Sequence, residues 1–543
     1  MAAKLTLKYL HAWSAPLAFA LVLLTSVPAH ANGTDEIALA LAQRFLVLYE
    51  AGVLPDAEVA ALQNFYEGRD LRLQWLGGAA APERVEALLQ TLAEAEREGL
   101  DPADYAAALD LAPRLGDLGG ADELAAADID LSAAALRYGL DLHDGRAQPQ
   151  AGDPNLFPAG QRLTATNLMW NLASVGDVAA YYRGLAPAHL AYRRLRNALA
   201  GYRLLAEQGG WPQVPEGPTL KPGMDDERLP VLRERLLVTA DLETAPEAAD
   251  TFYDADTEAA IRRFQERHGL EVDGAVGPMT LAALNVTVGR RIRQIEINME
   301  RWRWISDELA DRYIWVNMPA FSLDVIENGR TVMDMRVIVG RAYRQTPEFS
   351  GLITYLEANP FWNVPYSIAT KDLLPKIQAD PGYLASQGLE VFAGWSDEQP
   401  IDPATIDWSA LGAGRFPYRL RQDPGPLNAL GRIKFMFPNE YSVYLHDTPS
   451  RELFWRAKRD FSSGCIRVQK PIELGVYLLG PGWDEARLET ELDAGRNKAI
   501  RLPKPVRIYL TYSTAWVDDA GLVEFREDIY GRDAALVAAL AGG

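Results

Sequence analysis

The chain has 543 residues and carries 54 basic against 74 acidic side chains, a formal net charge of −20. About two to four domains are expected, because this length exceeds what one hydrophobic core supports. The acidic balance argues against nucleic acid as a partner, and the single cysteine excludes an intramolecular disulfide and a CxxC metal or redox site. The sequence also contains no clustered metal ligands and no nucleotide-binding glycine loop, so we expect no metal and no cofactor.

Residues 1–31 are predicted to be a secretory signal peptide. Lys4 and Lys8 precede a short apolar segment, residues 16–24, and Ala29-His30-Ala31 fits the small-x-small cleavage rule. The apolar segment is shorter than the roughly 20 residues that a membrane-spanning helix needs. We therefore expect export to the periplasm and no membrane span after cleavage. An uncleaved membrane anchor is the alternative.

Residues 32–210 are predicted to form a helical scaffold domain, because alanine and leucine recur there at helical spacing. Its charged residues fit solvated helix faces, and no candidate chemistry is found in it. Residues 211–227 are predicted to be a linker, since their prolines and glycines cannot continue a helix.

A smaller helical unit is predicted over residues 228–286. Asp273-Gly274 is a turn signal, and Thr280 would cap a last helix. From Phe264 to Thr280 the chain carries the pattern FQxxxGLxxDGxxGxxT. This segment resembles the type-1 peptidoglycan-binding domain, a three-helix module, which implies that it binds the glycan of the cell wall. A role as a spacer without sugar affinity is the alternative.

A connecting helix is predicted over residues 287–311, and a β-rich catalytic domain over 312–543. Several short β-prone segments with turn signals between them favour strands, and Asn328-Gly329 predicts a hairpin. The strand pattern fades at about 372–426, where proline, glycine and aspartate are frequent, and we interpret this segment as a lid over the site. The fold class is therefore α+β, with several domains.

The β-rich domain contains one cysteine, Cys465, and one histidine, His446. A thiol is mostly protonated at neutral pH, and a neighbouring imidazole can take its proton and stabilise the thiolate. Small residues before the cysteine suit a tight turn, whose N–H groups around Gly464 could hold an oxyanion. Asp447 could orient the imidazole through its carbonyl or its carboxylate. The alternative is that both residues only fill the core.

The residues around Cys465 resemble the YkuD-type catalytic domain of L,D-transpeptidases. That family carries a histidine, a spacer and then Ser/Thr-His-Gly-Cys-hydrophobic-Asn. Here Ser463 replaces the second histidine and Arg467 the asparagine, and both departures match a large periplasmic subgroup. The segment His446 to Ser450 and the segment from Asn359 to Pro365 also resemble that subgroup, as does the order of the domains.

The resemblance implies that a Cys465 thioester forms on a tetrapeptide stem, terminal D-Ala leaves, and an amine of a second stem attacks to give a 3→3 cross-link. His446 would carry the protons, and Ser463, Gly464 and Cys465 would shape the oxyanion site. Arg467 is a candidate for the substrate carboxylate, with a structural ion pair as the alternative. The other candidate substrate-binding residues are Tyr444, Trp362 and Asn359, with an aromatic core as the alternative for the two rings.

Two other functions stay open. An L,D-carboxypeptidase or another cell-wall cysteine hydrolase would need only water in place of the acceptor amine. Endopeptidases of the NlpC/P60 type usually place the cysteine before the histidine, whereas His446 precedes Cys465 here. The second alternative is a peptidoglycan-binding protein without activity, against which an intact Cys–His pair argues. The expected partners are peptidoglycan stem peptides and glycan.

Overall fold

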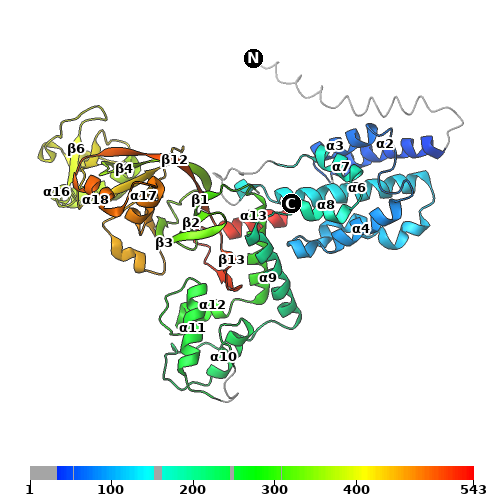
Figure 1. Ribbon diagram of the computed structural model, residues 1–543, viewed down its shortest axis with the longest axis horizontal. Coiled ribbons are helices and arrows are strands. Elements are labelled where there is room, and N and C mark those ends of the chain that lie inside the picture. The colour runs from blue at the N-terminus through cyan, green and yellow to red at the C-terminus, as the bar shows by residue number, and fades with distance from the viewer. Residues whose placement is uncertain (1–32, 53, 152–161, 245–249, 307, 543) are drawn as a thin grey trace.

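The computed structural model describes residues 33–52, 54–151, 162–244, 250–306 and 308–542. The predicted signal peptide lies outside these residues. In Figure 1 a helical body lies at one end of the molecule, a β-rich body lies at the other, and a small helical module hangs below the segment between them. The predicted α+β fold is confirmed. Within the described ranges, no helix is long and apolar enough to cross a membrane.

The N-terminal helices share one apolar core, to which Leu41, Phe65 and Leu136 contribute. Asp128 is buried there and accepts hydrogen bonds from the Tyr66 hydroxyl and from three successive backbone N–H groups, which fixes the turn after the second helix. The helices are α2 (Gly33–Ala51), α3 (Asp56–Glu67), α4 (Ala81–Ala93), α5 (Ala106–Leu109), α6 (Ala121–Asp144), α7 (Ala165–Ser174) and α8 (Val178–Leu185).

Helix α9 (Leu190–Glu207) does not join that core, although the predicted scaffold domain includes it. It packs on α13 (Val288–Arg303) and on a hairpin near the C-terminus, β13 (Ala515–Val517) and β14 (Val523–Phe525). Segments far apart in the sequence therefore meet in the middle of the molecule, as Figure 1 shows.

The small module consists of α10 (Leu229–Val238), α11 (Ala255–Arg267) and α12 (Pro278–Leu284) around their own core. The buried Gln265 explains most of its sequence pattern. The amide of Gln265 donates to Asp273 Oδ1 at 2.8 Å and to Thr280 Oγ1 at 3.2 Å, and its oxygen accepts the N–H groups of Asp273 and Gly274. Gly274 turns the chain with φ +74°, a conformation that favours glycine.

The β-rich domain is built on a nine-stranded sheet in the order β10-β3-β11-β9-β8-β4-β12-β1-β2. Because β2 also pairs with β3, the sheet closes on itself. Helices α17 (Pro471–Leu479) and α18 (Glu485–Asp493) pack on its apolar core. The strands are β1 (Arg312–Asn317), β2 (Ser322–Glu327), β3 (Arg330–Gly340), β4 (Phe349–Ala358), β8 (Ile433–Met436), β9 (Leu445–His446), β10 (Asp460–Ser462), β11 (Ile466–Val468) and β12 (Lys498–Thr511).

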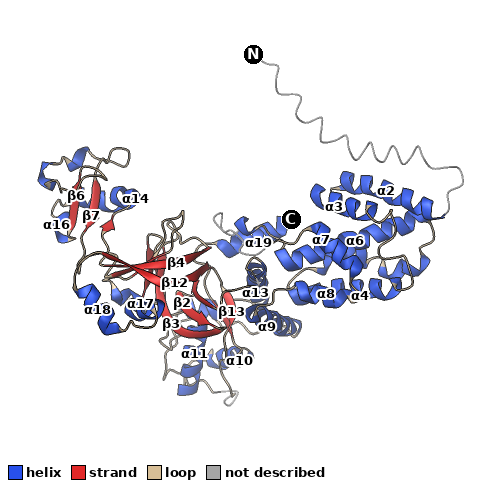
Figure 2. Ribbon diagram, turned by 45° about the horizontal axis from the view of Figure 1, so that its top comes forward, coloured by secondary structure: helices blue, strands red, loops and turns tan. Residues whose placement is uncertain are grey.

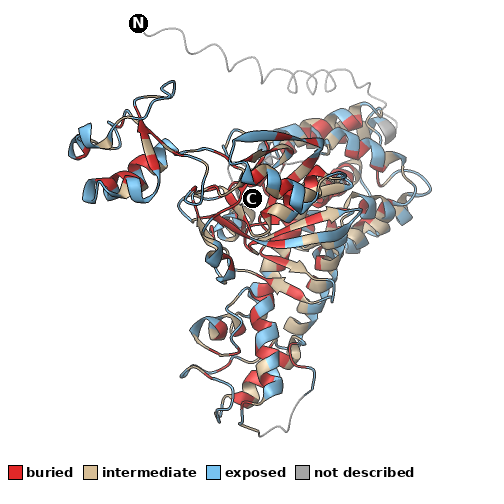
Figure 3. Ribbon diagram, turned by 60° about the vertical axis from the view of Figure 1, so that its left-hand side comes forward, coloured by how far each residue is buried: buried red, intermediate tan, exposed pale blue. Residues whose placement is uncertain are grey.

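The predicted lid corresponds to a small subdomain, here called the cap, which runs from β5 (Trp362–Asn363) to β7 (Arg419–Gln422). It begins before the predicted segment 372–426 and has regular structure, which is clear in Figure 2. Its other elements are α14 (Tyr366–Ile368), α15 (Leu374–Ala379), α16 (Tyr383–Ser386) and β6 (Leu389–Phe392). The cap has its own hydrophobic core, and the buried residues inside it are visible apart from the main body in Figure 3.

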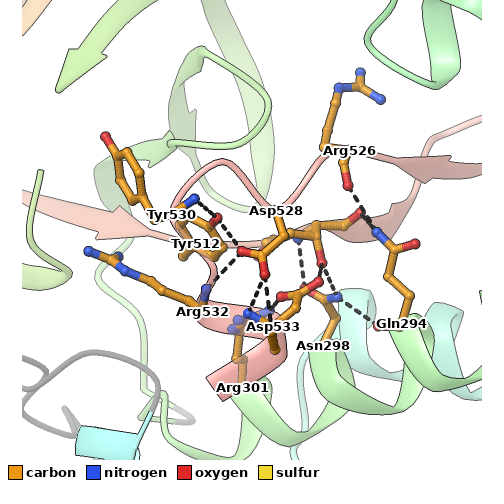
Figure 4. A network of polar contacts seen from close by, with 12 residues as sticks. Gln294, Asn298, Arg301, Tyr512, Arg526, Asp528, Tyr530, Arg532 and Asp533 are labelled. Carbon is orange, nitrogen blue, oxygen red and sulfur yellow. Dashed lines mark hydrogen bonds and ion pairs between the residues drawn. The ribbon is translucent and has the colours of Figure 1, made fainter. Parts of the chain in front are cut away.

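A polar network joins α13 to α19 (Arg532–Gly542), the last described helix (Figure 4). Asp533 accepts from Arg301 at 2.6 Å and from the Thr514 hydroxyl at 2.7 Å, and Thr514 also bonds the amide of Asn298. Asp528 receives the backbone N–H groups that open α19. These contacts hold the C-terminal segment against the connecting helix.

We expect Asp533→Ala to lower the free energy of unfolding by about 3–5 kcal/mol, because it leaves a buried guanidinium without its carboxylate. The side chain of Arg301 is only 6% exposed. Chemical denaturation followed by circular dichroism measures the loss. Asp519→Ala is the control, since Asp519 pairs with Arg194 but is 99% exposed, and should leave stability unchanged. Equal stability of the two variants would contradict a structural role for the network.

Candidate active site

A cleft of ≈ 670 Å³ lies between the sheet and the cap. It contains the cysteine and histidine that the sequence singled out. The lining residues from the sheet and its adjoining turns include Lys434, Tyr444, His446, Ser463, Gly464, Cys465 and Arg467, and those at the entrance to the cap include Phe361, Trp362, Asn363 and Pro365.

The pairing of β9 with β11 brings the histidine and the cysteine into the same cleft. The two strands are parallel, with Ile466 opposite Leu445 and Arg467 opposite His446. Leu445 and Ile466 are fully buried in the core. Successive side chains of a strand point to opposite faces. The residues on either side of these two, Tyr444 and His446 in one segment and Cys465 and Arg467 in the other, therefore face the cleft.

Cys465 ends a tight turn that is held by hydroxyl groups. Ser462 Oγ accepts the N–H of Gly464 at 3.1 Å and donates to the carbonyl of Cys465 at 2.5 Å, and Thr346 Oγ1 donates to the Gly464 carbonyl at 2.8 Å. Gly464 has φ +115°, which a side chain would strain. Its N–H is therefore occupied and unavailable to an oxyanion, contrary to the expectation. In the described part of the chain, the N–H of Cys465 has no acceptor.

His446 is oriented by the backbone of Asp447. The Nδ1 atom lies 2.5 Å from the Asp447 carbonyl oxygen, so in the neutral ring Nδ1 carries the proton. The backbone of Leu430 also interacts with the ring. The carboxylate of Asp447 instead accepts from the N–H of Arg432 and from the guanidinium of Arg451. Burial and then the charge of Arg467 lower the pKa of His446 to about 3, so the ring is neutral at physiological pH.

The thiol of Cys465 contacts two residues of the segment that leads into β9. Its sulfur lies 3.8 Å from the Ser442 carbonyl, and the hydroxyl and N–H of Tyr444 also bond to it. Burial raises the pKa of the thiol above its ordinary value, while Tyr444, Lys434 and Arg467 act in the opposite direction. At rest the cysteine is therefore a protonated thiol beside a neutral histidine.

Three family models match parts of this chain. The family model of the L,D-transpeptidase catalytic domain, YkuD, matches residues 311–479. Residues 311–479 are thus a YkuD-type L,D-transpeptidase domain. A model described as "Scaffold domain" matches residues 60–199, and one described as "Putative peptidoglycan binding domain" matches residues 234–284.

A curated relative in Haemophilus influenzae, named "Putative L,D-transpeptidase", is 37% identical over 242 residues. The match covers 44% of this chain and 48% of that protein, about half the length of each. The solved L,D-transpeptidase of Xylanimonas cellulosilytica (residues 123–326) has 17% identity and a TM-score of 0.19, over 55% of this chain and 99% of that one. The L,D-transpeptidase (Yku) of Stackebrandtia nassauensis has 16% identity and a TM-score of 0.22, over 55% and 96%.

Within the YkuD domain, the predicted substrate-binding residues divide into two groups. Tyr444, Trp362 and Arg467 line the cleft. Among the described residues Arg467 forms no ion pair, and its Nε has no hydrogen-bond partner, so the alternative role as a structural ion pair is not seen. Asn359 does not line the cleft. It is buried outside the cleft with φ +48°, and its amide donates to the carbonyls of Leu492 and Arg496.

Two charged residues of the YkuD domain's site were not predicted. Arg344 bonds the hydroxyl of Ser463 at 3.0 Å and pairs with Asp372 of the cap, so it connects the nucleophile turn to the cap. Lys434 lies on β8, directly opposite His446. Only the pairing of β8 with its neighbours reveals what Lys434 faces.

We expect the alkylation rate of Cys465 to rise steadily with pH and to be still rising at about pH 9, because the thiolate is the reactive form and the pKa of the thiol is raised. No inflection is expected between about pH 5 and pH 8, since His446 is already neutral there. Iodoacetamide labelling followed by mass spectrometry measures the rate without ambiguity, as the chain has one cysteine. A plateau reached by pH 6 would show a thiolate–imidazolium pair instead.

Proposed function

We propose that this protein is an exported, periplasmic L,D-transpeptidase that makes 3→3 cross-links in peptidoglycan through a thioester on Cys465. The observation that carries the proposal is one cleft that holds Cys465, the neutral His446 and Arg467, for which the described residues supply no ion-pair partner. The peptidoglycan-binding module in the same chain supports cell-wall peptidoglycan as the substrate.

In the first half-reaction His446 takes the thiol proton on Nε2, and the sulfur attacks the carbonyl between the third stem residue and D-Ala. The N–H of Cys465 is the donor available to the oxyanion that forms. The carbon–nitrogen bond then breaks, the leaving amine receives the proton from His446, and D-Ala departs. Because burial disfavours a charged His446, the proton is held only briefly.

In the second half-reaction an amine of another stem attacks the thioester carbonyl. His446 takes a proton from that amine and returns it to the sulfur as the carbon–sulfur bond breaks. The product is an amide between two stems, and the thiol is restored. Water in place of the amine would give a tripeptide and carboxypeptidase activity by the same steps.

Arg467 is suited to hold the carboxylate of the terminal D-Ala. A guanidinium binds a carboxylate with two parallel hydrogen bonds, and burial strengthens such contacts. Burial lowers the pKa of Arg467, so its charge is costly unless an anion approaches. Trp362, from the entrance to the cap, lies across the same cleft and offers an apolar wall to the stem.

We expect Cys465→Ala to abolish both D-Ala release and cross-linking, because no thioester can form, while binding to isolated cell walls persists. Tetrapeptide muropeptides incubated with the protein and analysed by mass spectrometry report all products. A dimer with a 3→3 bond supports the transpeptidase, and tripeptide alone supports the carboxypeptidase. Undiminished turnover by the variant would refute the assignment of the nucleophile.

We expect Arg467→Gln to reduce kcat/KM for tetrapeptide stems by about 10- to 100-fold, because a charge-assisted contact to the carboxylate is lost. A donor with an amidated terminus should lose much less, since it lacks the charge that Arg467 would bind. Steady-state kinetics with both donors make the comparison, and Arg487→Gln, at an exposed position on α18, is the control. Equal losses for the two donors would exclude carboxylate binding by Arg467.

A further inference from the structure

Lys434 lies on the floor of the cleft, and no step described above uses it. It is flanked on β8 by Ile433 and Phe435, which are buried in the core, so Lys434 faces the cleft. Cross-strand pairing places Lys434 between Glu357 of β4 and His446 of β9. The register thus sets a row of ionisable side chains across four strands that ends at Arg467.

The ammonium group of Lys434 contacts Tyr444, which in turn contacts Cys465. Its Nζ lies 4.0 Å from the centre of the Tyr444 ring, and the hydroxyl of Tyr444 bonds to Cys465. The Lys434 side chain is 15% exposed. Burial lowers the pKa of Lys434, and Glu357, whose Oε2 lies 3.8 Å from Nζ, acts in the opposite direction and favours the charged form. An ammonium over the face of a phenol ring is attracted to it and strengthens the hydroxyl as a hydrogen-bond donor.

The site needs a positive charge that the histidine does not supply. In cysteine enzymes that rely on a thiolate–imidazolium pair, the histidine carries the compensating charge. Here burial, Arg467 and Lys434 all disfavour a charged His446. Arg467 is assigned above to the substrate carboxylate, which would neutralise it once the donor binds. Lys434 is then the cation left beside the sulfur.

We propose that Lys434 is a positioning residue of this reaction, whose ammonium holds the Tyr444 phenol against Cys465 and supplies the charge that stabilises the thiolate. The inference deepens the proposed function and rests on it for its role in turnover. The effect of the Lys434 charge on the pKa of Cys465 can be measured without any cell-wall substrate.

Several segments bring charged or titratable groups toward the thiol. These are Glu357 from β4, Lys434 from β8, Tyr444 just before β9, His446 from β9, Arg467 from β11 and Arg344 from the loop between β3 and β4. Arg344 is paired with Asp372, and Glu357 also holds the amide of Asn497 at 2.9 Å. Removing the charge of Lys434 should therefore change the field at the sulfur more than removing that of Arg344.

The test is the pH dependence of Cys465 alkylation in the full chain with Lys434 replaced. Lys434→Met should move the inflection upward by about one pH unit or more, so labelling at pH 8 should fall about tenfold. Lys434→Arg keeps the charge and should restore most of the wild-type profile. Lys498→Met is the matched control, because Lys498 also pairs with a glutamate but lies outside the cleft.

A profile unchanged in Lys434→Met would overturn the inference, as would an equal shift in Lys498→Met. Circular dichroism checks the fold, and Glu357→Gln/Lys434→Met removes both partners, so that no buried carboxylate is left unpaired if the single variant unfolds. The double variant should still show the upward shift. If the shift is found but wild-type protein never releases D-Ala, the proposed function fails and the charge effect stands. Release of D-Ala without any shift refutes only the role of Lys434.

Discussion

The parallel pairing of β9 with β11 is the constraint on which the active site depends. These strands have only two and three residues, so their backbone bonds alone would hold them weakly. Their register is fixed by Leu445 and Ile466, both without exposure in the core. A shift of one residue would turn Cys465 into the core and an apolar side chain into the cleft. The position of the nucleophile is thus a consequence of core packing.

A parallel pair requires a crossover, and the crossover here also serves the site. The segment after His446 begins with Asp447, whose carbonyl orients the ring and whose carboxylate is held by Arg432 and Arg451. It ends at β10, where Ser462 shapes the nucleophile turn. The connection that topology demands therefore carries the groups that orient both reacting residues.

Burial then determines how the site distributes its charge. The same low polarity that keeps His446 neutral raises the pKa of the Cys465 thiol, so both reacting groups start uncharged. Positive charge comes from Lys434 on β8 and Arg467 on β11, and from Arg344 in the loop between β3 and β4. The charges in the cleft are therefore determined by strand pairing in the sheet as well as by the catalytic motif.

The sequence revealed what a local motif carries, and it did not reveal what depends on strand pairing or on individual hydrogen bonds. The catalytic pair could be inferred because a lone cysteine and histidine in one domain carry recognisable chemistry. The sequence could not show whether the carbonyl or the carboxylate of Asp447 orients His446, because a single local hydrogen bond decides it. Asn359 belonged to a recognisable motif, but its amide donates to the carbonyls of Leu492 and Arg496 near the end of α18. Lys434 was missed because its importance arises from non-local strand pairing.

The joints between the domains show how a cleft at one end can work with a binding module elsewhere in the chain. Arg267 of α11 pairs with Asp241 and donates to the carbonyl of Val523 at 2.8 Å, which ties the small module to the β13–β14 hairpin. Arg303 of α13 pairs with Glu300, which also accepts the N–H of Ala147 from the scaffold. Buried ion pairs contribute little net stability, but breaking one is costly, so they favour one arrangement over nearby alternatives. Arg301 and Asp533 form a further buried pair between α13 and α19, so the module, the scaffold and the C-terminal segment are each held in place by a buried charged contact.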